Sequence, residues 1–272
     1  MNRPLTIVVP VKHVPEAQGE RVLTGDPPVL ERGPGILSEL DEYALEAALQ
    51  LVEAAGGAEA GHRVHALTVG PADAAAALKR ALQLGADAGV HVLDDALAGS
   101  DAWVTARVLA AAVERIAEEE SRPVDLVLTG MASTDGTMSV VPAMLAERLG
   151  LPQVTYASEL TVSEGTVTIR RDGDTASETI ESSLPALVSV TDQINEPRYP
   201  SFKGIMAAKK KPVETWSLAD LGVDAGEVGQ ANAWTEVLET TKRPPREQGE
   251  IVTDEGEGGS KLADFLAAQK FV

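Results

Sequence analysis

A glycine-rich loop with several hydroxyl side chains carries the clearest chemical signal in the chain. The segment from Gly130 to Thr137 reads GMASTDGT and follows an apolar run typical of a strand. Glycine allows close backbone approach to a ligand, and a helix starting after the loop offers unpaired N–H groups and a positive dipole end. This combination suits a phosphate or nucleotide site. It is equally compatible with a plain polar connection, because the P-loop lysine and the G-x-G-x-x-G spacing are both missing.

Side chains for acid–base or nucleophilic catalysis are sparse. Of the four histidines, His65 and His91 stand in strand-like runs and are expected in the core or at a sheet edge. His13 follows the first apolar run and is the only histidine at an edge of the sheet where a ligand is expected. Asp135, in the Gly130 loop, is the one carboxylate that remains a candidate for a role in the site. The sequence has no G-x-S-x-G elbow and no H-E-x-x-H motif. These features favour a binding or carrier protein over a hydrolase.

A second segment, residues 185–212, changes in composition from apolar to proline-rich, then to apolar again and finally to basic. Residues 186–190 are apolar, Pro197 and Pro200 then exclude regular structure, and Phe202 opens an apolar stretch that ends in three consecutive lysines. Its cations stand out in a chain with a formal net charge of −19: Arg198, Lys203, Lys209, Lys210 and Lys211. The order of strand, rigid turn, apolar tip and cations predicts a docking loop held out by a scaffold. A loop leading into a solvated helix end is the alternative.

Composition narrows the class of protein. With 272 residues and 44% hydrophobic residues, the chain can build a full core as one large domain or two small ones. Cysteine is absent, which excludes disulfides and thiolate metal sites and favours an intracellular protein. Without an apolar run of about 20 residues or a signal-peptide cleavage site, we expect a cytoplasmic protein with no membrane span. The acidic net charge argues against general nucleic-acid binding.

The elements that must position these residues alternate between strands and helices. Apolar runs predict strands, and amphipathic stretches bounded by caps or glycines predict helices. Strands are expected at residues 5–11, 63–69, 89–93 and 124–128, and helices at 38–56, 72–84, 101–119 and 140–149. Ser38, with Asp41 at the capping-box position, and Ser100 are the expected N-caps.

This alternation predicts an α/β fold with a doubly wound, mostly parallel, Rossmann-like sheet. Short strands at 160–162, 167–171 and 176–180, with a turn at Asp172-Gly173-Asp174, predict an added antiparallel hairpin before residues 186–190 return to the sheet. Ligands of such sheets bind beyond the carboxyl ends of the strands, at the switch in strand order. The loops in question are residues 10–16, 70–71 and 130–137.

The last part of the chain differs in composition. We expect an α/β domain over residues 1–223 and a C-terminal extension over 224–272. The extension is polar up to residue 259 and then amphipathic over 260–271, where Leu262, Phe265, Leu266 and Phe271 can form an apolar edge. This pattern is typical of an arm that packs on a partner, and a frayed terminus is the alternative.

Several segments resemble the β subunit of electron-transfer flavoproteins. The signature reads DQINEPRYP over residues 192–200 and IMAAKKKP over 205–212. Further matches are the V-K pair ending at Lys12, a D-x-Y-A-x-E helix start at 41–46, a V-G-P turn at 69–71, an L-G-A-D run at 84–87, and segments 125–130 and 146–152. The resemblance extends over residues 5–223.

The resemblance implies an electron-carrier subunit rather than an enzyme. It implies a heterodimer with an α subunit, in which a FAD bound mainly by α carries electrons from dehydrogenases, such as the acyl-CoA dehydrogenases of fatty acid oxidation, to a quinone oxidoreductase. The β subunit of this family binds AMP as a structural ligand, and in electron-bifurcating relatives a second FAD takes that place. A stand-alone adenine-nucleotide-binding module of the same fold is the competing class.

Site residues follow from the same resemblance. The nucleotide is expected at Pro10, Ser38, Glu39, Leu40, Asp41, Val69, Gly130, Met131, Ala132, Ser133, Thr134, Asp135, Gly136, Thr137, Met138, Ser139, Val140 and Val141. Dehydrogenases are expected to dock on residues 195–211, with Phe202 as the apolar anchor beside Lys203, Ile205 and Met206. Many relatives have Asn at the position of Ser38 and some have amides near Val140. Phosphate binding would therefore depend on backbone N–H groups and nearby hydroxyls, which favours AMP over a second FAD.

Overall fold

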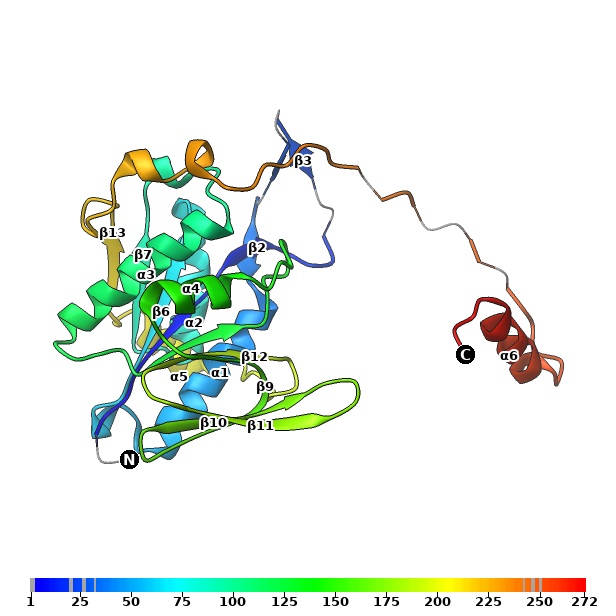
Figure 1. Cartoon of the computed structure of the whole chain (residues 1–272), viewed down its shortest axis with the longest axis horizontal. Helices are drawn as coiled ribbons and strands as arrows, with labels where there is room; N and C mark the ends of the chain where they lie inside the picture. Colours follow the sequence, from blue (N-terminus) through cyan, green and yellow to red (C-terminus); the bar gives the residue numbers. More distant parts are fainter. Residues whose placement is uncertain are drawn as a thin grey trace. The chain divides into compact units, whose positions relative to one another are not determined.

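The computed structural model describes residues 3–19, 22–25, 28–31, 33–241, 243–245, 248–249 and 251–272. Its main feature is a nine-stranded sheet in the order β11-β10-β9-β12-β8-β1-β6-β7-β13 (Figure 1). The strands from β12 to β13 in this order are parallel, whereas β9, β10 and β11 pair antiparallel with one another. The expected doubly wound α/β fold with an antiparallel hairpin is confirmed.

The elements have the following bounds. The large sheet contains β1 (Thr6–Pro10), β6 (Arg63–Val69), β7 (Ala88–Val92), β8 (Leu126–Gly130), β9 (Gln153–Ser163), β10 (Thr166–Asp172), β11 (Ser177–Ser183), β12 (Ala186–Val190) and β13 (Val213–Trp216). Two small sheets pair β2 (His13–Pro15) with β5 (Gly35–Leu37) and β3 (Leu23–Thr24) with β4 (Val29–Leu30). The α-helices are α1 (Glu39–Ala54), α2 (Ala75–Leu84), α3 (Ala102–Glu119), α4 (Val141–Leu149), α5 (Phe202–Ala208) and α6 (Gly258–Ala268).

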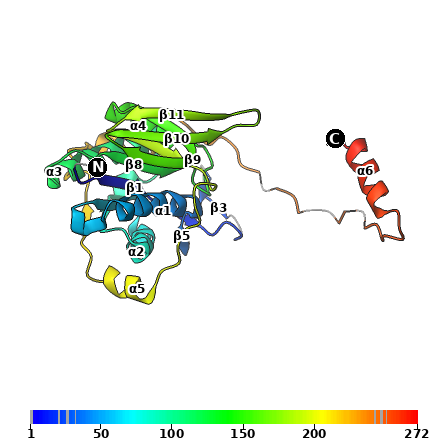
Figure 2. The same ribbon diagram turned by 90° about the horizontal axis from the view of Figure 1, so that it is seen from below.

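Helices cover both faces of the parallel strands (Figure 2). Side chains alternate along β1, so Ile7 and Val9 pack with α1 and α2 while Val8 packs with α3 and α4. The first core includes Leu45 of α1, and the second includes Leu145 of α4. Near-continuous apolar strands such as β1 and β8 are required because both faces of the sheet are covered.

The helix starts differ from the expected caps. Asp101, rather than Ser100, caps α3, because its Oδ1 accepts the N–H of Val104 at 3.0 Å. The hydroxyl of Ser100 instead accepts the N–H of Gly229 at 3.0 Å. At α1, Ser38 occupies the N-cap position but makes no side-chain cap hydrogen bond, and the expected capping box with Asp41 does not form. Tertiary contacts engage the side chains of Ser100 and Asp41, so neither bonds to the start of its own helix.

Two strands extend beyond the sequence expectation. β9 covers Gln153–Ser163 rather than residues 160–162, and it pairs parallel with β12 before it turns antiparallel to β10. β13 adds an unexpected parallel edge strand beside β7, in which only Trp216 is buried. A strand with one buried side chain lacks the apolar pattern by which strands are recognised.

The chain divides into two compact units, one ending at Val237 and the other spanning Leu238–Val272. The expected domain boundary at residues 223 and 224 therefore falls within the first unit. In the second unit α6 carries the exposed apolar side chains Leu262 and Phe265. None of the helices in the described part of the chain is long and apolar enough to cross a membrane.

Candidate functional site

The carboxyl ends of β1 and β8 form the switch point of the sheet, because the chain leaves β1 towards β6 and later returns on the other side as β8. Contacts with β6 fix the backbone after β1. The N–H of Val11 donates to the carbonyl of Leu67 at 2.8 Å, and Thr68 Oγ1 donates to the carbonyl of Val11 at 2.8 Å. The N–H of Ser38 donates to the carbonyl of Lys12 at 2.9 Å. The start of α1 is thereby held at the same rim.

Asp41 joins α1 to the loop after β1. Its Oδ2 accepts the N–H of Lys12 at 2.8 Å, and the residue is buried. Burial raises the pKa of Asp41 to about 7, and Asp135 adds to this effect, while the N–H and the charge of Lys12 oppose it. Asp41 therefore titrates near neutral pH in the middle of the candidate site.

Gly130, the last residue of β8, is in close contact with the start of α1. A Cβ at this position would lie 2.6 Å from the carbonyl oxygen of Leu40 and 2.9 Å from Oδ1 of Asp41. Only glycine permits this approach, so the predicted close backbone approach at Gly130 serves helix packing. The contact brings the Gly130 loop against the first turn of α1.

Lys12 bridges the two loops of the switch point. Its Nζ lies 2.9 Å from Oδ1 of Asp135 and 3.5 Å from Oγ of Ser133. The Asp135 side chain is 2% exposed and also accepts the N–H of Gly136 at 2.7 Å. This pairing neutralises the one carboxylate of the Gly130 loop.

The backbone between this loop and α4 is shaped to present N–H groups. Thr137 and Ser139 have positive φ angles of 49° and 57°. Residues that alternate between right- and left-handed conformations turn successive N–H groups to one side, which creates a concave anion site. In the described part of the chain, the N–H groups of Ser139, Val140 and Val141 donate no hydrogen bond. The loop thus offers donors next to the positive end of α4.

Two hydroxyl groups near the rim also fit a polar ligand. Ser38 Oγ and Thr129 Oγ1 are buried and have no hydrogen-bond partner among the described residues. A buried hydroxyl without a partner costs free energy, so such groups mark places where a ligand or water completes the structure. Thr129 lies in β8, which ends at the switch point, and Ser38 precedes α1, which starts there.

The structure brings most of the expected nucleotide residues to one rim. Pro10 and Gly130 end neighbouring strands, residues 38–41 start α1, and residues 131–141 connect β8 with α4. Val69 ends β6, the next strand along. Glu39 turns to solvent, so its side chain adds little to an enclosed site.

Sequence reasoning missed two residues of this rim. In the sequence, Lys12 stands out only as part of the V-K pair, and Thr129 lies one residue beyond the strand expected at 124–128. The signal that could have found Lys12 is its position, two residues beyond a strand that lies at the switch point.

Two of the histidines make internal contacts, as expected for core or sheet-edge residues. His65 Nε2 lies 3.0 Å from Oε1 of Glu120, and His91 Nε2 lies 2.9 Å from the carbonyl oxygen of Gly70. His13 lies in β2 and is buried.

The expected docking residues lie on and beside α5, away from the core. Phe202 is 81% exposed, and Tyr199, Ile205 and Met206 are also exposed. Ser201 caps this short helix through the N–H of Gly204 at 3.0 Å. The side chains of Lys203, Lys209 and Lys210 face solvent. The apolar tip predicted from the sequence is thus presented to the surface.

Sheet order, helix placement and the polar switch point define a Rossmann-like, doubly wound α/β protein. A family model described as "Electron transfer flavoprotein domain" matches residues 29–221. The chain belongs to the family of electron transfer flavoprotein β subunits, and with it to the electron-transfer subunits.

Relatives with this name match nearly the whole chain. "Electron transfer flavoprotein subunit beta" of Mycobacterium tuberculosis is 46% identical over 270 residues, covering 98% of this chain and 99% of the relative. The protein of the same name from Mycobacterium leprae is 46% identical over 268 residues, with the same coverage. "Caffeyl-CoA reductase-Etf complex subunit CarD" of Acetobacterium woodii is 32% identical over 250 residues, covering 92% of each chain.

Proposed function

We propose that this chain pairs with an α subunit and holds one AMP at the switch point of its sheet. In this proposal a FAD, bound mainly by the α subunit near the interface, accepts electrons from dehydrogenases and delivers them to a quinone oxidoreductase. The FAD supplies the redox chemistry, and this chain supplies orientation, a nucleotide that stabilises the fold, and a docking surface. The exposed apolar side chains of α6 are the proposed contact of the C-terminal arm with the α subunit.

The observation that carries the AMP site is the set of unpaired polar groups at one rim. The N–H groups of Ser139, Val140 and Val141 lie on a loop with two positive φ angles before α4, which suits a phosphate. The buried hydroxyl of Ser38 supplies a further partner for the nucleoside part. These residues would hold the nucleotide, and Lys12 with Asp135 would keep the two loops together.

Identification of the nucleotide in the purified complex tests this proposal. The chain is co-expressed with its α subunit, the complex is denatured, and released nucleotides are quantified by chromatography and mass spectrometry. The expected result is one AMP and one FAD per heterodimer. Two FAD and no AMP would support the bifurcating type of subunit. A chain that purifies alone with adenylate would support the stand-alone module.

The variant Ser38→Ala tests the hydroxyl. Removal of a buried hydroxyl without a partner should leave the nucleotide-free chain equally stable or more stable. In the complex it should weaken AMP retention about 2- to 10-fold, which corresponds to the loss of one hydrogen bond. Ser189→Ala is the matched control, because Ser189 Oγ accepts the N–H of Tyr156 at 3.0 Å. The control should lose stability with or without nucleotide.

We further propose that dehydrogenases dock on residues 195–211. A large exposed apolar side chain such as Phe202 can fill a pocket on a partner, and neighbouring lysines raise the rate of encounter with acidic surfaces. Phe202→Ala should slow electron acceptance from a dehydrogenase while the flavin content of the complex stays unchanged. Equal rates for the variant and the parent would exclude this role of Phe202.

A further inference from the structure

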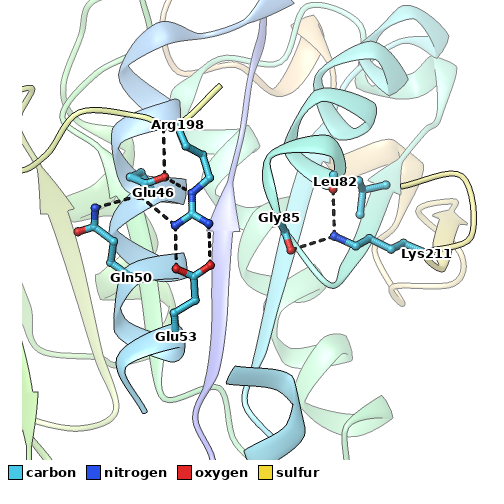
Figure 3. A network of polar contacts seen from close by, with 7 residues as sticks. All are labelled: Glu46, Gln50, Glu53, Leu82, Gly85, Arg198 and Lys211. Carbon is cyan, nitrogen blue, oxygen red and sulfur yellow. Dashed lines mark hydrogen bonds and ion pairs between the residues drawn. The ribbon is translucent and has the colours of Figure 1, made fainter. Parts of the chain in front are cut away.

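The proposed docking loop is fastened to the sheet domain on both sides of its apolar tip (Figure 3). It leaves the sheet at the end of β12 and returns at β13. Arg198 ties the first part of the loop to α1, and Lys211 ties the last part to the end of α2. Phe202 lies between these two attachments.

Arg198 makes a double ion pair with two glutamates of α1. Its Nε lies 2.7 Å from Oε2 of Glu46, and its Nη2 lies 3.1 Å from Oε1 of the same carboxylate. Glu53 lies two helical turns after Glu46, and its carboxylate accepts hydrogen bonds from Nη1 of Arg198 at 2.6 Å and from Nη2 at 2.9 Å. The N–H of Arg198 also donates to Glu46 Oε2 at 3.3 Å. One planar guanidinium therefore satisfies both carboxylates in bidentate geometry, which a lysine cannot do.

The surroundings keep this ion pair charged. Burial by itself would raise the pKa of Glu46, but hydrogen bonds from Arg198 and Gln50 outweigh it and lower the pKa below its usual value. Hydrogen bonds to Glu53 and then Glu46 raise the pKa of Arg198. The Glu46 side chain is 6% exposed, so loss of its cation would leave a carboxylate nearly shielded from water.

The second attachment uses the end of a helix. Lys211 Nζ donates to the carbonyl oxygens of Leu82 at 3.0 Å and Gly85 at 2.9 Å, at the C-terminus of α2. A cation at this end of a helix pairs unsatisfied carbonyls and the negative dipole end. Gly204 of α5 lies against the same place, because a Cβ there would be 2.6 Å from the carbonyl oxygen of Gln83.

These attachments change the interpretation of the cation-rich segment. Arg198 and Lys211 are committed to internal contacts, which leaves Lys203, Lys209 and Lys210 for a partner. The side chains of Tyr199 and Phe202 project between the fixed points, at 89% and 81% exposure. A tip that is ordered before binding loses less conformational entropy on docking.

We infer that Arg198 is a positioning residue for dehydrogenase docking, which acts by clamping the loop to Glu46 and Glu53 so that Phe202 is presented in a fixed place. This inference rests on the docking role proposed for Phe202. Arg198 itself contacts no partner in this scheme, so its effect on electron transfer passes entirely through the anchor.

Steady-state reduction of the purified heterodimer by a dehydrogenase tests the inference, with the heterodimer as the varied substrate. Arg198→Met should raise the half-saturating concentration of the heterodimer about ten-fold, while the maximal rate stays within about two-fold. Arg198→Lys should raise the half-saturating concentration nearly as much, because lysine keeps the positive charge but lacks the planar guanidinium that pairs with both carboxylates. Arg80→Met is the matched control, since Arg80 Nε pairs with Glu42 of α1 at 2.8 Å and the side chain makes no hydrogen bond or ion pair with the described residues of the loop.

A double-mutant cycle separates positioning from general structure. If Arg198 acts through Phe202, the double variant Arg198→Met/Phe202→Ala should match Phe202→Ala alone. Additive effects, or an unchanged half-saturating concentration for Arg198→Met beside an impaired Phe202→Ala, would overturn the inference and leave the docking role intact. An unimpaired Phe202→Ala would overturn both.

A second variant covers the case in which Arg198→Met fails to fold. Glu53→Gln removes half of the clamp at a side chain that is 54% exposed, and it keeps the pairing with Glu46. It should raise the half-saturating concentration by about two- to three-fold with unchanged flavin content. No rise for Glu53→Gln together with no rise for Arg198→Lys would also overturn the inference.

Discussion

Lys12 Nζ lies 2.9 Å from Oδ1 of Asp135, and this ion pair joins the loop after β1 to the loop after β8. The two residues are far apart in sequence and meet because β1 and β8 are neighbours in the sheet. The Lys12 side chain is 42% exposed, whereas that of Asp135 is 2% exposed. The pair therefore connects the two loops of the switch point through one buried carboxylate and one partly exposed ammonium group.

Lys12→Met should weaken this connection between the loops after β1 and β8. We expect the variant to lose about 1–2 kcal/mol of unfolding free energy, between the values for exposed and buried ion pairs, because only one partner is buried. Faster loss of bound nucleotide during gel filtration of the heterodimer should accompany the change. Lys79→Met, at an exposed position of α2, is the control and should change neither quantity. Full nucleotide retention by Lys12→Met would contradict a role for the pair in holding the site.

Gly130→Ala should destabilise the chain by overpacking. The new Cβ would be 2.6 Å from a carbonyl oxygen of α1, so the helix start must move, at a cost of about 1–3 kcal/mol. Thermal unfolding of the heterodimer measures this cost, and nucleotide content should fall with it. Gly89→Ala in β7 is the matched control, because its Cβ would meet no atom closer than 3.6 Å. Equal melting temperatures for both variants would contradict the close contact at Gly130.

Asp41 should make stability depend on pH. Burial raises its pKa to about 7, so between about pH 4 and pH 7 the folded chain keeps a proton that the unfolded chain has lost. The contribution of Asp41 to stability therefore falls as the pH rises through this window, by at most about 1.4 kcal/mol per pH unit, and is constant above it.

Asp41→Asn removes this titration and can still accept the N–H of Lys12. Denaturant unfolding of parent and variant at several pH values should show a shallower decline for the variant between pH 5 and pH 7. Subtraction of the two curves cancels the titrating groups that both chains share and that do not interact with Asp41. Parallel curves would show that Asp41 keeps an ordinary pKa.

Local patterns in the sequence were sufficient to predict the layers of the fold. The apolar run at residues 5–11 yields β1, and glycines such as Gly85 and Gly150 end helices where expected. Once strands and helices alternate, right-handed crossovers leave few sheet orders, and the three loops expected to bind a ligand, 10–16, 70–71 and 130–137, include both loops of the switch point.

Local sequence patterns could not predict contacts between segments that are distant in the sequence. Ser100 and Asp101 are both suitable N-cap residues for α3. Which of them caps the helix depends on Gly229, 129 residues away from Ser100, because its N–H donates to the Ser100 hydroxyl. In the sequence, Arg198 is one of five cations in the segment 185–212. Nothing near it in sequence indicates that it pairs with Glu46 and Glu53. Such roles are decided by packing, which sequence spacing does not encode.

Asp101 also anchors the segment that leads to the C-terminal unit. Its Oδ2 accepts the N–H of Trp234 at 2.8 Å and both the N–H and the hydroxyl of Thr235 at 3.0 Å. The Trp234 ring stacks on Trp103 of α3 with centroids 4.6 Å apart, and Arg148 of α4 lies 4.0 Å from the centroid of the Trp103 ring. One carboxylate thus caps a helix and fixes the last residues before Leu238.

Asp101→Ala should release this segment. We expect a loss of about 1–2 kcal/mol from the missing cap and the backbone hydrogen bonds, and much faster hydrogen exchange at Trp234 and Thr235. Burial would raise the pKa of Asp101, but hydrogen bonds from Val104 and then Thr235 lower it, so its stabilisation is present above about pH 4 and is lost as the pH falls further. The parent and the variant should therefore converge in stability in acid. Asp95→Ala, at an exposed neighbouring position, is the control. If exchange at residues 234–235 stays slow in Asp101→Ala, the aromatic stack holds the segment without the carboxylate.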